Sequence, residues 1–126
     1  MNIVDSSGWL EILANGKHAE TFLEVIESPG LVVPSITIFE VTKRARALGT
    51  EAQAQRIEVH MRRVEVVDLT ADRASAAAVI SFKHKLPMAD SIIYAVALEF
   101  NAILWTMDAD FKGLPLVRHV AKSPDA

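Results

Sequence analysis

Short apolar runs alternate with longer helical segments along this chain, and this alternation limits the possible folds more than any other feature. The apolar runs predict strands over residues 2–5, 31–33, 64–67, 102–105 and 116–117. Apolar residues at helical spacing predict one helix after the turn at 6–8 and further helices over 17–28, 35–48, 50–63, 70–85 and 90–101. Because strands that alternate with helices form parallel sheets, we expect an α/β fold, a three-layer α/β/α sandwich with a mostly parallel central sheet.

The length and composition of the chain predict one ordinary globular domain, residues 1–126, in which 51% of the residues are hydrophobic. We find no internal repeat, low-complexity tract or linker, and expect only residues 122–126 to form a loose tail. No apolar run approaches the roughly 18 to 20 residues of a membrane span, and the N-terminus lacks the features of a signal peptide. We therefore expect a soluble, cytoplasmic protein.

The scarcity of soft metal ligands excludes several classes of site. The chain has no cysteine, so it has no disulfide, thiolate metal site or cysteine nucleophile. Its four histidines are scattered without the HExxH spacing, which argues against a zinc hydrolase. The net charge of −3 gives no overall attraction to nucleic acid, so any such binding depends on local basic patches.

Acidic residues follow predicted strands or begin predicted helices at several places. Asp5 ends the first strand, Asp90 opens the helix over 90–101, and Asp108 follows the strand over 102–105. In open α/β sheets ligands gather at the carboxyl ends of strands, so Asp5 is well placed for a site. A helix that starts near Asp90 and runs back along the sheet leads into a strand that ends close to the start of the helix. We therefore expect Asp90 and Asp108 to be neighbours.

Three acidic residues, Asp5, Glu40 and Asp90, also have a purely structural interpretation. Asp5 or a following serine caps the first helix. Glu40 completes the capping-box pattern Thr37-Ile38-Phe39-Glu40, in which the glutamate side chain reaches back to the N–H of the cap residue. Asp90 could be the N-cap of the helix that it opens. Taken singly, Asp5 and Glu40 are explained at least as well by these structural roles as by catalysis.

Taken together, Asp5, Glu40, Asp90 and Asp108 indicate one shared site, because coincidence weakens as the number of such acids rises. An uncompensated carboxylate in apolar surroundings is costly, and a bound cation would offset that cost. Carboxylates without histidine or cysteine suit Mg²⁺, with Mn²⁺ as a substitute. Because such an ion activates water and neutralises charge on phosphate, the expected chemistry is phosphodiester hydrolysis.

Basic residues that follow Glu40 are candidates for contact with a substrate. Lys43 and Arg44 lie three and four residues after Glu40, so all three can share one helix face. They form either an exposed ion-pair cluster or a group that holds substrate phosphates, and we slightly favour phosphate contact. Further candidates for substrate selectivity are Arg46, Lys83 and Lys85, although Lys83 and Lys85 also suit a helix C-terminus for dipole reasons.

Four sequence motifs together resemble those of the PIN-domain nucleases, in particular the VapC-type toxins of toxin–antitoxin pairs. The motifs are Ile3-Val4-Asp5-Ser6-Ser7, Thr37-Ile38-Phe39-Glu40-Val41, Leu86-Pro87-Met88-Ala89-Asp90-Ser91-Ile92-Ile93-Tyr94 and Thr106-Met107-Asp108-Ala109-Asp110-Phe111. Their order and spacing cover nearly the whole chain. No motif is decisive alone, but the four together at this length are a specific signal.

The resemblance implies an acidic site that binds one or two divalent ions. The implied catalytic residues are Asp5, Glu40, Asp90 and Asp108, of which Asp5 and Asp90 are the surest metal ligands. Asp110 would contact the metal through water or support the turn. The hydroxyls of Ser6 and Thr106 would orient the carboxylates by hydrogen bonding.

The resemblance also implies a biological role. It predicts a Mg²⁺-dependent endoribonuclease that acts on tRNA or another structured RNA as the toxin of a type II toxin–antitoxin system. The expected assembly is a homodimer, with a cognate VapB-type antitoxin whose C-terminal segment covers the active groove.

Three alternatives remain at the level of sequence. One is a PIN-domain nuclease outside toxin systems, acting in RNA processing or on DNA flaps, although the short chain without appended domains disfavours it. A response-regulator receiver domain also binds Mg²⁺ with clustered acids, but its phosphoacceptor aspartate and later lysine are not visible in this order. The third is a non-catalytic binding module, which would keep the fold but lack the metal.

Overall fold

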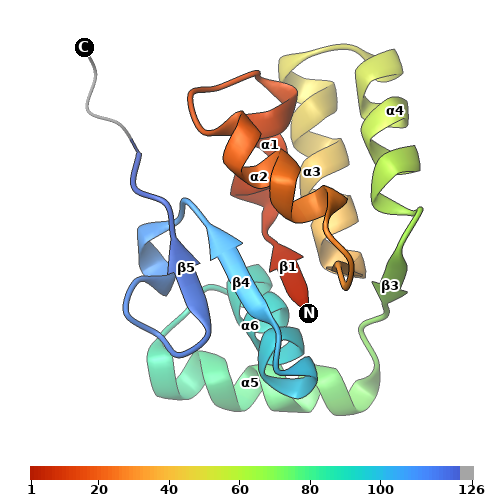
Figure 1. Ribbon diagram of the computed structural model, residues 1–126. Coiled ribbons are helices and arrows are strands. Elements are labelled where there is room, and N and C mark those ends of the chain that lie inside the picture. The colour runs from red at the N-terminus through yellow and green to blue at the C-terminus, as the bar shows by residue number, and fades with distance from the viewer. Residues whose placement is uncertain (123–126) are drawn as a thin grey trace.

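The computed structural model describes residues 1–122 and shows parallel strands between two groups of helices (Figure 1). β1 (Asn2–Val4) pairs with β4 (Ile103–Thr106), which pairs with β5 (Val117–His119). On the other side β2 (Val32–Pro34) pairs with β3 (Glu65–Val67). A parallel bridge between Asn2 and Leu31 joins β1 to β2, so the strand order is β3-β2-β1-β4-β5.

The helices agree with the predicted alternation, and the fold class is confirmed. They are α1 (Ser6–Leu13), α2 (Ala19–Glu27), α3 (Ser35–Leu48), α4 (Glu51–Met61), α5 (Ala71–His84), α6 (Met88–Phe100) and a 3₁₀ turn, η1 (Ala109–Phe111). The turn predicted at 6–8 is wrong, because α1 already begins at Ser6. The other predicted boundaries differ by at most two residues, as at α6, which begins at Met88 rather than Asp90, and at β5, which extends to His119. Within residues 1–122, no helix combines the length and apolar character that crossing a membrane requires. Apart from Lys122, the tail expected over 122–126 lies outside the described residues.

The sheet has a hydrophobic core on each of its two faces. Side chains alternate along a strand, so Ile3 packs in the core with α5 and α6 while Val4 packs in the core with α1 and α2. Val32 and Val33 divide in the same way. Figure 1 shows α5 and α6 on one side of the sheet and α1, α2 and α4 on the other. Burial on both faces explains why the inner strands β1, β2 and β4 are mostly apolar.

The order in which strands are added to the sheet reverses at β1. The strands β2 and β3 are added on one side of β1, and β4 and β5 on the other. At such a switch point the connections that leave neighbouring strands diverge, and a crevice forms at the carboxyl ends of the strands. Here those ends belong to β1 and β4, which Asp5 and Met107 directly follow.

Close packing of α1 fixes its position against the carboxyl end of β1. Gly8 lies so near the strand that a Cβ atom on it would be 2.4 Å from Cγ1 of Val4 and 2.7 Å from Cδ1 of Phe22. The indole N–H of Trp9 donates a hydrogen bond to the carbonyl oxygen of Val4 at 3.1 Å. These contacts fix the start of α1, and with it Asp5, against the end of β1.

Candidate metal centre and active site

Asp5 is buried, with only 3% of its surface exposed, and both of its carboxylate oxygens accept hydrogen bonds. Oδ1 accepts from the Ser7 hydroxyl at 2.5 Å and from the Gly8 N–H at 3.3 Å, so Asp5 is also the N-cap of α1. Oδ2 accepts from the Thr106 hydroxyl at 2.6 Å. Burial raises the pKa of Asp5, the three hydrogen bonds oppose that rise, and nearby Asp108 adds to it.

Two hydroxyl groups connect the ends of β1 and β4. The Ser7 oxygen accepts a hydrogen bond from the N–H of Met107 at 2.9 Å, and the Thr106 oxygen accepts one from the N–H of Asp108 at 2.9 Å. Each hydroxyl therefore binds Asp5 and a main-chain N–H near the end of β4 at the same time. The sequence analysis named Thr106 but missed Ser7, because adjacent serines at a helix start look alike until the phase of the helix is known.

Glu40 does not belong to a capping box, so that structural interpretation is wrong. α3 begins at Ser35, which places Thr37 inside the first turn, where it is fully buried and its hydroxyl has no hydrogen-bond partner among the described residues. Glu40 lies further along the helix and points towards the other acids. Burial raises its pKa, a hydrogen bond with Ser6 lowers it, and Asp5 and Asp108 raise it further. Its Oε1 atom is buried without a partner in residues 1–122.

Asp90, Asp108 and Asp110 form a compact trio. One carboxylate oxygen from each lies within 4.8 Å of the others. Asp90 is the third residue of α6, whose N-cap is Pro87, and it makes no capping hydrogen bond, so its interpretation as a cap is wrong. The pKa of Asp90 is raised from 3.8 to about 7. Burial is the largest cause of this rise, and the rest comes from the negative charges of Asp108, Asp5, Glu40 and Asp110.

The cluster fits a divalent cation. Within residues 1–122 no lysine or arginine forms an ion pair with any of its acids. The orphaned oxygen of Glu40 and the raised pKa of Asp90 are both signs of negative charge without compensation. Hard carboxylate oxygens suit Mg²⁺ and similar ions. Asp90, Asp108 and Asp110 would hold the ion, with Glu40 available beside them, while Asp5 is already held by the two hydroxyls.

The model of the PIN domain family matches residues 3–115 of the sequence. This chain belongs to the PIN-domain family. The match includes strands β2, β3 and β4 and all of β1 except Asn2. It also includes the five acids of the cluster, Asp5, Glu40, Asp90, Asp108 and Asp110. A comparison with curated protein sequences found no match.

Solved structures of similar fold agree with the assignment to the PIN domain. A toxin–antitoxin complex from Klebsiella pneumoniae superposes with a TM-score of 0.81 at 24% identity, over 94% of this chain and 96% of that chain. The sarcin–ricin loop cleaving toxin VapC20 from Mycobacterium tuberculosis gives 0.73 at 16% identity, over 89% and 92% of the two chains. A DNA-bound VapBC from Salmonella typhimurium gives 0.72 at 18% identity, over 96% and 98%. These likenesses extend over nearly the full length of the PIN domain.

The basic residues after Glu40 are exposed on α3. The ammonium group of Lys43 lies 5.6 Å from the centroid of the Phe39 ring, and Arg44 lines a hollow beside the end of α1. Arg46 forms an ion pair with Glu51 at 2.7 Å. In the described part of the PIN domain, neither Lys43 nor Arg44 forms an ion pair with Glu40. Their contact with substrate stays a prediction.

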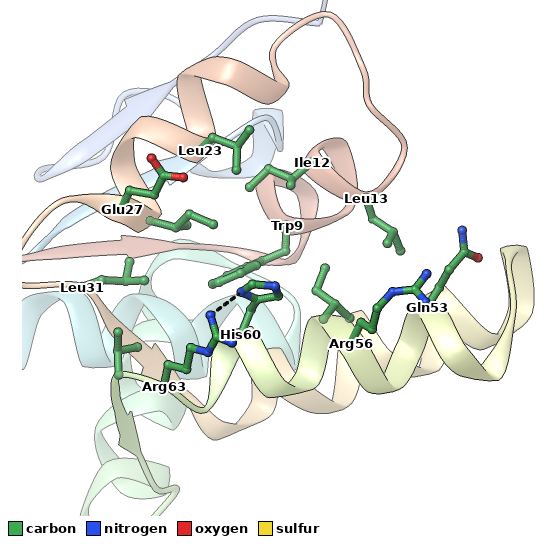
Figure 2. Close-up of a pocket in the computed structure, with 13 residues that line it drawn as sticks. Trp9, Ile12, Leu13, Leu23, Glu27, Leu31, Gln53, Arg56, His60 and Arg63 are labelled. Atoms are coloured by element: carbon green, nitrogen blue, oxygen red, sulfur yellow. Dashed lines mark hydrogen bonds between the residues drawn. The ribbon is translucent and has the colours of Figure 1, made fainter.

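A separate apolar groove of about 570 Å³ lies between α1, α2 and α4 of the PIN domain (Figure 2). Its apolar lining consists of Trp9, Ile12, Leu13, Leu23, Ile26, Leu31, Ile57 and Val64. The polar side chains around it are Glu27, Gln53, Arg56, His60 and Arg63. None of the five clustered acids contributes to this groove, so it is a second surface, distinct from the candidate metal centre.

Proposed function

We propose that this chain is a Mg²⁺-dependent endoribonuclease that acts as the toxin of a type II toxin–antitoxin pair. The observation that carries the proposal is the convergence of Asp90, Asp108 and Asp110 beside Asp5, at the switch point of a PIN-domain sheet. Carboxylates so arranged suit phosphodiester hydrolysis, because that chemistry needs a divalent ion and little covalent help from the protein.

Each polar residue of the cluster has a distinct part in this proposal. Ser7 and Thr106 hold the two oxygens of Asp5 in fixed positions, and Ser6 does the same for one oxygen of Glu40. The trio of aspartates would bind Mg²⁺, which supplies Lewis-acid stabilisation of the charge that develops on the phosphate oxygens. Its positive charge would also offset the repulsion that raises the pKa of Asp90, so that Asp90 is ionised in the loaded enzyme.

RNA is the favoured substrate because one similar structure is described as a toxin that cleaves the sarcin–ricin loop. That likeness, at 16% identity, supports the class of reaction and not a particular cleavage site. We keep tRNA and other structured RNA as the candidate substrates. The alternative, a PIN-domain nuclease that processes RNA outside a toxin system, uses the same metal chemistry and differs only in its partners.

An antitoxin protein is the proposed partner. Two similar structures are complexes of a toxin with its antitoxin or of VapBC with DNA. The groove in Figure 2 has an apolar lining suited to the apolar face of a helix, and Arg56 and Arg63 beside it could pair with acidic side chains of that helix. A segment continuing from the groove to the acid cluster would carry a basic group that replaces the cation.

A homodimer is the proposed assembly of the free protein. Large apolar side chains are exposed on α5 and at the start of α6, where Val79, Phe82 and Met88 have exposed fractions of 65%, 89% and 74%. Val79 and Phe82 are three residues apart and therefore share one face of α5. Burying this face against a second copy would remove it from water.

A cleavage assay with purified protein tests the proposed activity. Structured RNA, including bulk tRNA, should be cut in Mg²⁺, spared in excess chelator and cut again when Mg²⁺ is restored. The Asp108→Asn variant should lose this cleavage. The matched variant Asp72→Asn removes an exposed carboxylate at the start of α5, away from the cluster, and should cleave normally. Cleavage that persists in excess chelator would contradict the metal-dependent mechanism.

Co-expression with the product of the adjacent gene tests the toxin role separately. The toxin proposal requires a stable complex of the two proteins and relief of growth inhibition. A nuclease that cleaves RNA but forms no such complex would belong to the alternative class, in which a PIN domain processes RNA.

A further inference from the structure

A second hollow, of about 460 Å³, lies beside the acid cluster at the carboxyl ends of β4 and β5. Its lining residues are Ser7, Met107, Asp108, Ala109, His119 and Lys122. Asp108 belongs both to this hollow and to the aspartate trio. Any group bound in the hollow is therefore adjacent to the candidate metal centre.

His119 presents a buried nitrogen without a partner. It is paired in register with Thr106, so their side chains lie on the same face of the sheet, the face on which Thr106 binds Asp5. Nε2 of His119 is shielded from solvent and makes no hydrogen bond within residues 1–122. An unsatisfied buried polar atom is unfavourable, so a ligand group that reaches and bonds to this nitrogen would remove that cost.

Lys122 provides a cationic group in the same hollow. It is exposed and forms no hydrogen bond or ion pair with any residue in the described part of the chain. No other lysine or arginine lines the hollow. His119 and Lys122 both line the hollow, and phosphate oxygens accept hydrogen bonds from an imidazole N–H and from an ammonium group.

We propose that this hollow binds a backbone phosphate of the RNA strand, next to the phosphate that is cleaved at the aspartate trio. This proposal rests on the nuclease function proposed above and specifies how the strand is held. Lys122 would contact the phosphate as a cation, and Nε2–H of His119 would donate a hydrogen bond to it. The two residues would position the strand and take no part in bond breaking.

Binding can be measured without cleavage. The imidazole signals of the four histidines are resolved by NMR in Mg²⁺ buffer at fixed pH, and the His119→Gln variant identifies the signal of His119. Titration with adenosine 5′-monophosphate should shift this signal, whereas adenosine should leave it unmoved. Lys122→Gln should weaken the apparent affinity by about tenfold. The matched variant Lys17→Gln removes an exposed lysine beyond the far end of α1 and should bind as the parent does.

Equal shifts with adenosine and its monophosphate would overturn the proposal in favour of base recognition. No shift at His119, or an unchanged affinity in Lys122→Gln, would overturn it as well. In the cleavage assay Lys122→Gln should raise KM by about tenfold with little change in kcat. A lower kcat at unchanged KM would contradict a positioning role. If the parent cleaves no RNA, the proposed function fails, while the titration still decides whether the hollow binds phosphate.

Discussion

Replacing Asp90 by asparagine should stabilise the metal-free protein while abolishing its activity. The substitution keeps the size and shape of the side chain, replaces one acceptor oxygen by an NH₂ donor, and removes one negative charge from the trio with Asp108 and Asp110. In the metal-free parent, burial and the neighbouring carboxylates raise the pKa of Asp90 from 3.8 to about 7. The ionised form is therefore penalised by the fold at neutral pH.

The size of the penalty follows from this pKa. Each pKa unit corresponds to about 1.4 kcal/mol, so ionised Asp90 lowers the free energy of unfolding by at most about 4 kcal/mol. Solvent screens a half-buried carboxylate, and we expect about 1 to 2 kcal/mol to remain. Asparagine also loses the favourable interaction of aspartate with the N-terminus of α6, about 0.5 kcal/mol. The net gain in stability should be about 1 kcal/mol.

The control variant Asp72→Asn isolates the helix-dipole contribution. Asp72 also lies in the first turn of a helix, α5, but it is exposed and outside the acid cluster. Its replacement should lower stability by about 0.5 kcal/mol, and Asp90→Asn should raise it. Denaturant unfolding of both variants and the parent in chelator at pH 7.5 measures the difference.

The pH dependence has a definite sign. Below about pH 4, Asp90 is protonated in the folded parent and increasingly in the unfolded chain, so the charge penalty is absent. Between pH 4 and 7 the unfolded chain releases the proton while the folded protein retains it, and the parent loses stability relative to Asp90→Asn. Above pH 7 the difference should be constant. A difference that is flat from pH 4 to 7, or a variant as destabilised as Asp72→Asn, would refute the reasoning.

Three further outcomes are expected. Gly8→Ala should destabilise the fold by about 1 kcal/mol or more in urea unfolding, although alanine favours helix, because its Cβ would approach Cγ1 of Val4 to 2.4 Å; a gain in stability would contradict this packing. Thr106→Val should cost about 2 kcal/mol in thermal unfolding because it leaves a buried oxygen of Asp5 unbonded, and Thr106→Ser should restore most of the loss. Phe82→Glu should convert a dimer into a monomer in light scattering, and an unchanged mass would place the dimer contact elsewhere.

The layered fold was predictable because its causes are local and repeated. The helix over 35–48 was predicted with the boundaries of α3. A capping box formed by Thr50 and Gln53 opens α4. The interpretation failed at Glu40 because Pro34 already precedes a helix that begins at Ser35, so the later capping-box pattern is internal to it. Local patterns alone do not say which of two possible starts the helix uses.

The residues of the candidate site could be predicted from the sequence only in part. The expectation that Asp90 and Asp108 are neighbours came from chain direction alone, and both belong to the compact trio. The sequence left two roles open for Asp110, contact with the metal through water or support of the turn, yet its carboxylate completes that trio. Its place depends on the η1 turn, where its own N–H donates to Asp108 at 2.9 Å, and the role of Ser7 depends on the pairing of β1 with β4. Such long-range geometry leaves little trace in a single sequence.

The pairing of β1 with β4 also determines when the acid cluster can assemble during synthesis of the chain. Asp5 and Thr106 are 101 residues apart in the chain, and Asn2 pairs with Ile103. At about 5 to 20 residues per second, a ribosome completes β4 about 5 to 20 s after β1. Until then Asp5 lacks the hydroxyl of Thr106, and Asp108 and Asp110 do not yet exist. A nascent chain therefore carries no assembled acid cluster until Asp110 has been made.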